Sequence, residues 1–181
     1  SQSGRHYSLY KALLAFPFTM NVMTCLINQC SCNNFILQRW KKVLQIMICK
    51  IPGNYQLKKL RVIQLIEADL NLLLRLVWGE KLVNNIMQNN QFSMEQMGSR
   101  PGFQCSSAAL LKTLSFDLIR VTRSSATIFN NDAKACYDRI IPFFSLLCCQ
   151  HFGLPTAAAS FLLTFLQQAE YHVKTCFGTS E

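Results

Sequence analysis

The chain has 181 residues, of which 50% are hydrophobic and 15% are charged. This length and composition predict a globular protein with a real core and exclude an intrinsically disordered chain. Residues 1–66 contain nine Lys or Arg and no acid, whereas residues 67–181 contain nine of each sign, so the net charge of +9 lies entirely in the first segment. Such a basic segment favours a polyanionic partner, namely nucleic acid, nucleotide phosphate or an anionic membrane surface; a solvated basic surface is the alternative.

The first half of the chain predicts helices followed by a hairpin. Residues 8–30 carry mostly apolar residues at helical spacing and are interrupted by Pro17. Two apolar runs follow at residues 43–50 and 60–66, and the sequence between them begins with the turn residues IPGN. Apolar runs joined by a basic loop that contains Gly and Pro predict a long β-hairpin.

The next segments predict two helices. Residues 67–88 have helical spacing, with Asp69 as a plausible N-cap. Residues 106–123 form an amphipathic pattern with Ser106 or Ser107 near the cap. We expect both segments to be helical.

The remaining segments predict a strand, further helices and a last strand. The stretch ATIFNND, residues 126–132, reads as a short buried strand, with a helix beginning at about Asp138, and residues 170–177 read as another strand. The mixture of helices with a hairpin and separate strands predicts an α+β fold.

An uncharged stretch raises the question of a membrane span. Residues 140–166 contain no Asp, Glu, Lys or Arg over 27 residues, which exceeds the roughly 20 residues that a transmembrane helix needs. Gly153 and Pro155 predict a helix end and a new start within this stretch. We therefore expect two buried helices, with a membrane-associated protein inserted through these residues as an alternative.

Nine cysteines form no recognisable framework. Their number is odd, and neither the spacing of Cys25, Cys30 and Cys32 nor the adjacent pair Cys148–Cys149 matches a common zinc pattern. No signal peptide is recognisable at the start. The sequence therefore predicts reduced thiols in an intracellular protein, without disulfides or a structural metal.

The stretch FNNDAKACYDRI, residues 129–140, places Asp132 at the end of the expected strand and Asp138 six residues later. A carboxylate at the exposed end of a buried strand can hold a hard cation, and two Mg²⁺ ions about 3.5–4 Å apart serve phosphoryl transfer. One carboxylate cannot hold two ions, and an N-cap role on the following helix satisfies Asp138. The alternative is that both aspartates only cap a strand–helix connection.

This stretch resembles the first carboxylate motif of reverse transcriptases, especially those of non-LTR (LINE-type) retroelements, in which an aromatic residue precedes a second Asp. Two further blocks follow the order of that family. Residues 60–82 resemble its fingers block, and residues 95–114 resemble its Gln-x-Gly-(x)2-Pro-Gly loop with the following helix. The blocks together cover roughly residues 40–181 and are fairly specific as a set.

The resemblance implies a right-hand polymerase fold with an N-terminal helical region in residues 1–40, a fingers-like region in 41–126 and a partial palm in 127–181. It implies an RNA template, a DNA primer and a deoxynucleoside triphosphate as partners, with Mg²⁺ as cofactor. In the same family, the basic hairpin would lie over the template and nucleotide phosphates.

The resemblance also assigns site residues. Asp132 would ligate Mg²⁺ with help from the backbone carbonyl of Ala133, and Tyr137 would lie under the incoming sugar, where the alternative is an ordinary core aromatic. Arg61 would grip the triphosphate, and Lys50 matches a basic position of the fingers less securely. The template-side loop, for which a plain turn is the alternative, would comprise Gln96, Gly98, Pro101 and Gly102.

The later motifs of the family, a Gln-Gly loop ending in Ser-Pro and an aromatic-x-Asp-Asp turn, do not occur in these 181 residues. Only Glu170 and Glu181 are acidic after Asp138. Because the two-metal mechanism needs further carboxylates, we expect this chain alone to be inactive, and we interpret it as the fingers and first palm segment of a longer polymerase. The principal alternative is a non-enzymatic module that binds nucleic acid through residues 39–61.

Overall fold

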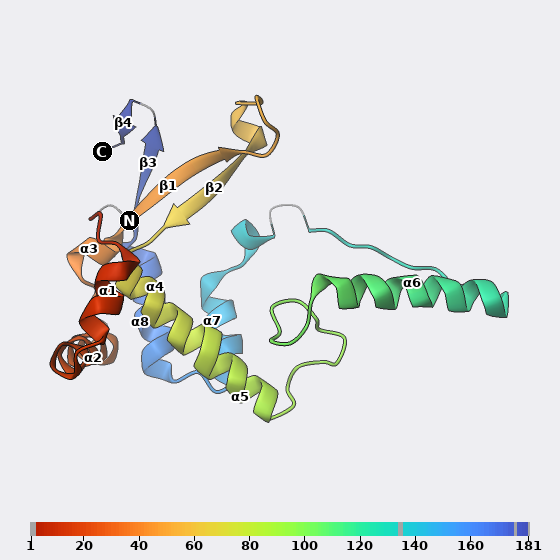
Figure 1. Cartoon of the computed structure of the whole chain (residues 1–181), viewed down its shortest axis with the longest axis horizontal. Helices are drawn as coiled ribbons and strands as arrows, with labels where there is room; N and C mark the ends of the chain where they lie inside the picture. The colour runs from red at the N-terminus through yellow and green to blue at the C-terminus, as the bar shows by residue number, and fades with distance from the viewer. Residues whose placement is uncertain (1–2, 134–135, 176, 181) are drawn as a thin grey trace.

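The computed structural model describes residues 3–133, 136–175 and 177–180, except the side chain of Asp138 (Figure 1). It is a helix-rich α+β structure, as the element pattern predicts. A small mixed sheet extends from a group of packed helices, and helix α6 lies apart from both (Figure 1).

The N-terminal region consists of three helices. Helix α1, Tyr7–Leu14, and helix α2, Pro17–Cys32, are separated at the predicted proline, which occupies the first turn of α2. A short helix α3, Gln38–Lys41, leads directly into the sheet. Proline at this position costs no helical hydrogen bond, because the first N–H groups of a helix have no intrahelical acceptor.

The predicted hairpin is confirmed. Strand β1, Lys42–Cys49, pairs antiparallel with β2, Leu60–Leu65, with Leu44 opposite Leu65 at one end of the ladder. A short 3-10 helix η1, Leu57–Lys59, lies in the connection. The two apolar runs and the turn chemistry of IPGN are local signals, which explains why they located this element correctly.

The sheet is completed by the predicted C-terminal strand. Strand β3, Glu170–Thr175, runs parallel to β1, and β4, Gly178–Thr179, pairs antiparallel with β3. The strand order is β2-β1-β3-β4. The hairpin therefore has β2 as a free edge, while only residues 42–46 of β1 pair with β3.

A continuous helical segment follows the hairpin, as predicted for residues 67–88. It comprises α4, Ala68–Leu74, a π-helix η2, Arg75–Leu82, and α5, Val83–Gln88. The predicted N-cap is wrong. Glu67 occupies the cap position and Asp69 lies in the first turn, because the carboxylate of Asp69 is engaged by residues that precede β1.

Two helices form the uncharged stretch, as predicted: α7, Pro142–His151, and α8, Thr156–Gln168. Only the second is buried to any extent, since α8 buries three residues, whereas α7 buries only Leu146. The two helices are separated at Gly153, which has φ +95°. A Cβ at this glycine would lie 2.5 Å from Asn85 Nδ2, so both the backbone conformation and the close approach require glycine. Over the described residues, no single helix is long and apolar enough to cross a membrane, although α1 and α2 together meet that criterion across a bend of 117°.

The main hydrophobic core lies where α2, α4 and α8 meet the start of the sheet. Trp40 is fully buried and packs edge-to-face on Phe161, with ring centroids 6.0 Å apart. Val43 and Leu70 bring β1 and α4 into the same cluster. The other buried members of this core are Cys30, Ile36, Leu73 and Phe165. A smaller cluster joins the π-helix and α5 to α7 and α8.

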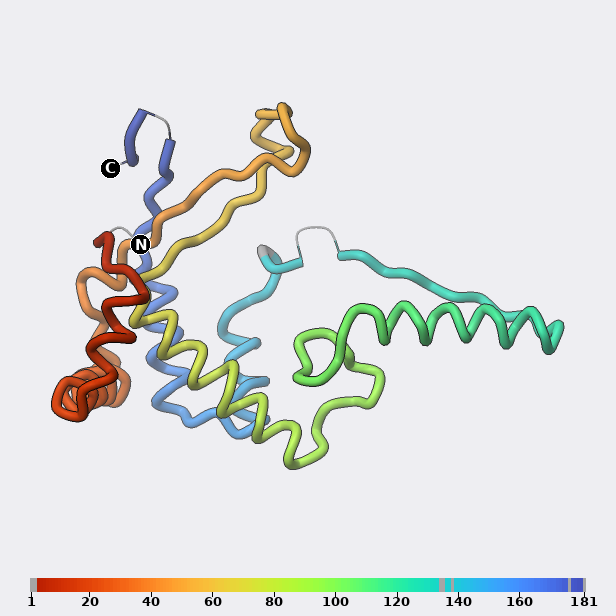
Figure 2. Tube along the Cα trace, in the orientation of Figure 1, coloured from red at the N-terminus to blue at the C-terminus, as the bar shows by residue number. Residues whose placement is uncertain are grey.

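The segment from residue 105 to residue 141 departs most from expectation. Helix α6, Cys105–Thr122, matches the helix predicted for residues 106–123, with Gln104 at the cap and both serines in the first turn, but α6 buries none of its residues. The expected buried strand is absent, because residues 124–133 are neither helical nor paired and Phe129 is 89% exposed. A strand needs a neighbour for its backbone hydrogen bonds, and this segment instead returns alongside α6 toward α7 (Figure 2).

Candidate nucleic-acid interface

Four cationic side chains gather at the far end of the hairpin, and we call them the basic tip: Lys50, Lys58, Lys59 and Arg61. All four residues are exposed. The backbone N–H of Lys50 donates to the carbonyl of Lys59 at 3.1 Å, which closes the ladder beyond β1 and β2. Within the described part of the chain, none of the four forms an ion pair with an acid.

Local turn chemistry shapes the basic tip. The N–H of Asn54 donates to the carbonyl of Ile51 at 3.1 Å, and Gly53 adopts φ +79°. The side chain of Asn54 then accepts from the N–H of Gln56 at 3.2 Å, immediately before the 3-10 helix that carries two of the lysines. Since the hairpin extends away from the helices (Figure 1), the basic tip presents its charges to solvent.

The base of the hairpin is closed by Asp69. This residue is fully buried and pairs with the guanidinium of Arg39, while its Oδ1 accepts from Trp40 Nε1 at 2.9 Å and from the N–H of Leu70 at 3.0 Å. Arg39 and Trp40 precede β1, whereas Asp69 follows β2. One carboxylate therefore joins both ends of the hairpin.

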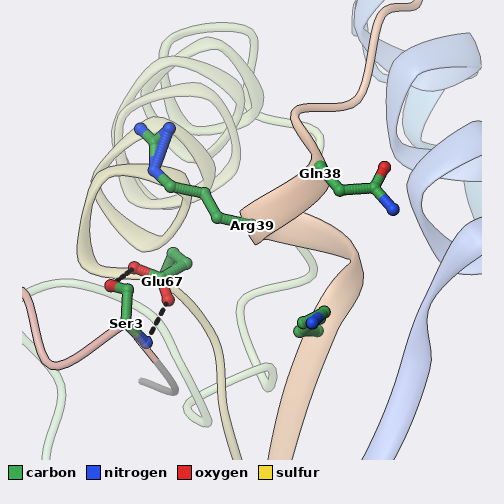
Figure 3. Close-up of a pocket in the computed structure, with 5 residues that line it drawn as sticks. Ser3, Gln38, Arg39 and Glu67 are labelled. Carbon is green, nitrogen blue, oxygen red and sulfur yellow. Dashed lines mark hydrogen bonds between the residues drawn. The ribbon is translucent and has the colours of Figure 1, made fainter.

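A second buried acid lies beside this pair. Glu67 is fully buried, and its two carboxylate oxygens accept from Ser3, Oε1 from the backbone N–H at 3.1 Å and Oε2 from the hydroxyl at 2.6 Å (Figure 3). A pocket of about 350 Å³ opens here. It is lined by Ser3, Gln38, Arg39, Lys42 and Glu67.

The sequence contains a signal for this cluster beyond the helix cap predicted at Asp69. Glu67 and Asp69 are the first two acidic residues of the chain, after nine cations. Acids that appear directly after a strand in a basic segment are candidates for pairing with those cations. Their partners, Ser3 and Arg39, are distant in sequence, so their identity required the structure.

The residues expected around the metal lie on the exposed segment after α6. Asp132 and Ala133 are exposed, and Tyr137 is 88% exposed in the 3-10 helix η3, Tyr137–Arg139. Asp138 lies within η3, and the helix predicted to begin near it begins at Pro142 with Ile141 at the N-cap, so its predicted cap role is wrong. Because Tyr137 is so exposed, its alternative role as a core aromatic is also wrong.

The described residues do not assemble a two-metal site. Across residues 3–133, 136–175 and 177–180, no three His, Cys, Asp or Glu side chains lie close enough to share a metal ion. Asp132 and the carbonyl of Ala133 are accessible oxygen ligands, and Mg²⁺ is commonly held by one or two carboxylates together with substrate phosphates. They could hold one ion in that way, but further carboxylates would be needed for two.

The predicted template-side loop is an exposed series of turns between α5 and α6. The side-chain amide of Gln96 donates to the carbonyl of Gly98 at 3.0 Å, and Gly102 adopts φ +83°. Pro101 lies between them and is exposed. The guanidinium of Arg100 stacks 4.5 Å from the ring centroid of Phe103, which orders the end of the loop.

The structure thus brings Arg61 and Lys50 to one end of the hairpin, together with the other two lysines of the basic tip. Among the described residues, no hydrogen bond or ion pair joins Asp132 to that tip. No protein-family model, curated protein or solved structure matches the chain.

Proposed function

We propose that the chain forms the fingers and the first part of the palm of an RNA-directed DNA polymerase of the non-LTR retroelement type. The three ordered sequence blocks support the assignment to a polymerase. The basic tip is the structural observation that supports this assignment. Its four exposed cations lie at the end of a hairpin and form no ion pair with an acid among the described residues. Such an array suits the phosphates of a primer–template and a nucleotide.

In this proposal each group has a distinct task. The planar guanidinium of Arg61 binds the triphosphate, and Lys50 contributes charge beside it. Asp132 and the backbone carbonyl of Ala133 would hold Mg²⁺, which would offset the charge of the nucleotide phosphates, and Tyr137 would lie under the nucleotide sugar. The remaining palm carboxylates are not among these residues, so we expect the 181 residues alone to bind nucleic acid without extending a primer.

The role of Asp132 can be tested by measuring the affinity for an RNA–DNA primer–template with and without Mg²⁺ at constant ionic strength. We expect Mg²⁺ to tighten binding about threefold or more in the native chain, because an ion held at Asp132 would attract the phosphates, and Asp132→Asn to abolish this gain. Asp117→Asn, which changes an exposed aspartate on α6 in the same way, should keep it. An equal Mg²⁺ effect in all three chains would contradict the polymerase assignment.

The second candidate is a non-enzymatic module that binds nucleic acid through its basic segment. The same basic tip favours it, since cations at a hairpin end bind phosphates whether or not a metal is present. This function predicts an affinity that falls steeply with salt and that Asp132→Asn leaves unchanged.

A further inference from the structure

Glu67 is a buried acid whose carboxylate depends on a distant residue for its hydrogen bonds. Its carboxylate is fully buried, and the only hydrogen bonds that it receives within the described chain come from Ser3, 64 residues earlier. No cation of the described residues lies within ion-pair distance of it. A buried carboxylate that loses its donors must regain them from water, because an unpaired buried charge is very costly.

Glu67 lies at the junction between the hairpin and the helices. It follows β2 by two residues and occupies the N-cap position of α4, so it marks the corner where the hairpin joins the helices. On the other side of the pocket, Arg39 and Lys42 mark the start of β1. The two hydrogen bonds of Ser3 go to Glu67, at the corner where β2 leads into α4 (Figure 3).

A second anchor holds the same N-terminal segment. Tyr10 of α1 is only 4% exposed. Burial raises the pKa of its hydroxyl, and the nearby carboxylate of Asp69 raises it further. Helix α1 contacts α4. Between the anchors, Gly4 adopts φ +68° and His6 caps α1 by accepting from the N–H of Ser8 at 3.3 Å.

The two strands of the hairpin are held unequally. The first residues of β1 are fixed on one side by β3, whereas β2 is an edge strand that pairs only with β1. Apart from that pairing, β2 is restrained where it enters α4, next to Glu67. If Ser3 leaves, the corner at Glu67 loses both hydrogen bonds from the N-terminal segment, and β2, which leads into α4 there, loses that restraint.

We propose that residues 3–10 act as a releasable strap that fixes the orientation of the hairpin through the two hydrogen bonds from Ser3 to Glu67. With the strap bound, the basic tip is held in one direction relative to the helices. With the strap released, the corner opens and the hairpin gains freedom. The proposal concerns the motion of the hairpin and does not require that the tip bind nucleic acid.

Hydrogen exchange of the full chain tests the strap with three variants of one residue. Ser3→Thr retains both donors, Ser3→Ala loses the hydroxyl, and Ser3→Pro loses both. We expect amides of residues 61–69 to exchange about tenfold faster in Ser3→Pro, about threefold faster in Ser3→Ala and at the native rate in Ser3→Thr. Amides of α8, which lie in the core, should keep their native rates in all variants.

Two results would overturn the proposal. If residues 61–69 exchange at the native rate in Ser3→Pro, the strap does not hold the hairpin. If α8 accelerates by the same factor as β2, the segment contributes only to global stability. Should Ser3→Pro fail to fold, the comparison of Ser3→Ala with Ser3→Thr decides between the same outcomes.

Discussion

Replacing Asp69 with alanine is expected to lower the free energy of unfolding by about 3–5 kcal/mol, because removing one partner of a buried ion pair leaves the other uncompensated. The Arg39 guanidinium, whose side chain is only 23% exposed, and the indole N–H of Trp40 would both lose their acceptor. Urea denaturation followed by far-ultraviolet circular dichroism measures the change.

A control variant shows whether the loss of stability is specific to Asp69 or follows the removal of any aspartate. Asp117 pairs with Arg120 on the surface of α6, and its side chain is 52% exposed. Asp117→Ala should leave the unfolding midpoint almost unchanged, since exposed ion pairs contribute little. Equal midpoints for the two variants would show that Asp69 does not close the base of the hairpin.

Replacing Trp40 with alanine should cost a similar amount, about 3–5 kcal/mol, because the truncation leaves a large cavity in the core. The ring is fully buried, packs on Phe161 and donates to Asp69. The effects of Trp40→Ala and Asp69→Ala should not add, because the two residues share a hydrogen bond. The measurement is again the denaturation midpoint with its slope.

Phe129 provides the control for Trp40. It ends the apolar run that predicts a buried strand, yet it is 89% exposed. Phe129→Ala should therefore change the stability by less than about 0.5 kcal/mol, as surface substitutions usually do. A loss of several kcal/mol would instead mean that residues 126–132 pack as the sequence pattern predicts.

The elements that could be predicted from the sequence depend on local signals. The hairpin has two apolar runs and a turn between them, and the break between α7 and α8 has Gly153, which the backbone requires. Asp69 was misassigned as a cap because its real partner, Arg39, lies 30 residues away. No local pattern specifies a contact at that separation.

The prediction of a strand at residues 126–132 was wrong for a related reason. An apolar run with β-branched residues predicts a strand only where a neighbouring strand exists, and pairing is a property of the whole fold. For the same reason the sequence could bring Lys50 and Arg61 together, since both flank one hairpin, but it could not specify what surrounds Asp132.

The central claim is that the basic tip binds nucleic-acid phosphates, and the salt dependence of binding tests it most directly. The tip variant changes the four cations of the basic tip to Gln: Lys50, Lys58, Lys59 and Arg61. The control variant has the same net charge and changes four exposed cations elsewhere to Gln: Arg75, Lys112, Arg120 and Arg123.

The affinity of each variant for a single-stranded RNA is measured between low and moderate salt. If all four tip cations contact phosphate, the slope of log affinity against log salt should decrease in magnitude by about 3 for the tip variant, at roughly 0.7 per contact, and should be unchanged for the control. Equal slopes for the two variants would show that binding follows net charge alone and would contradict the assignment of the tip.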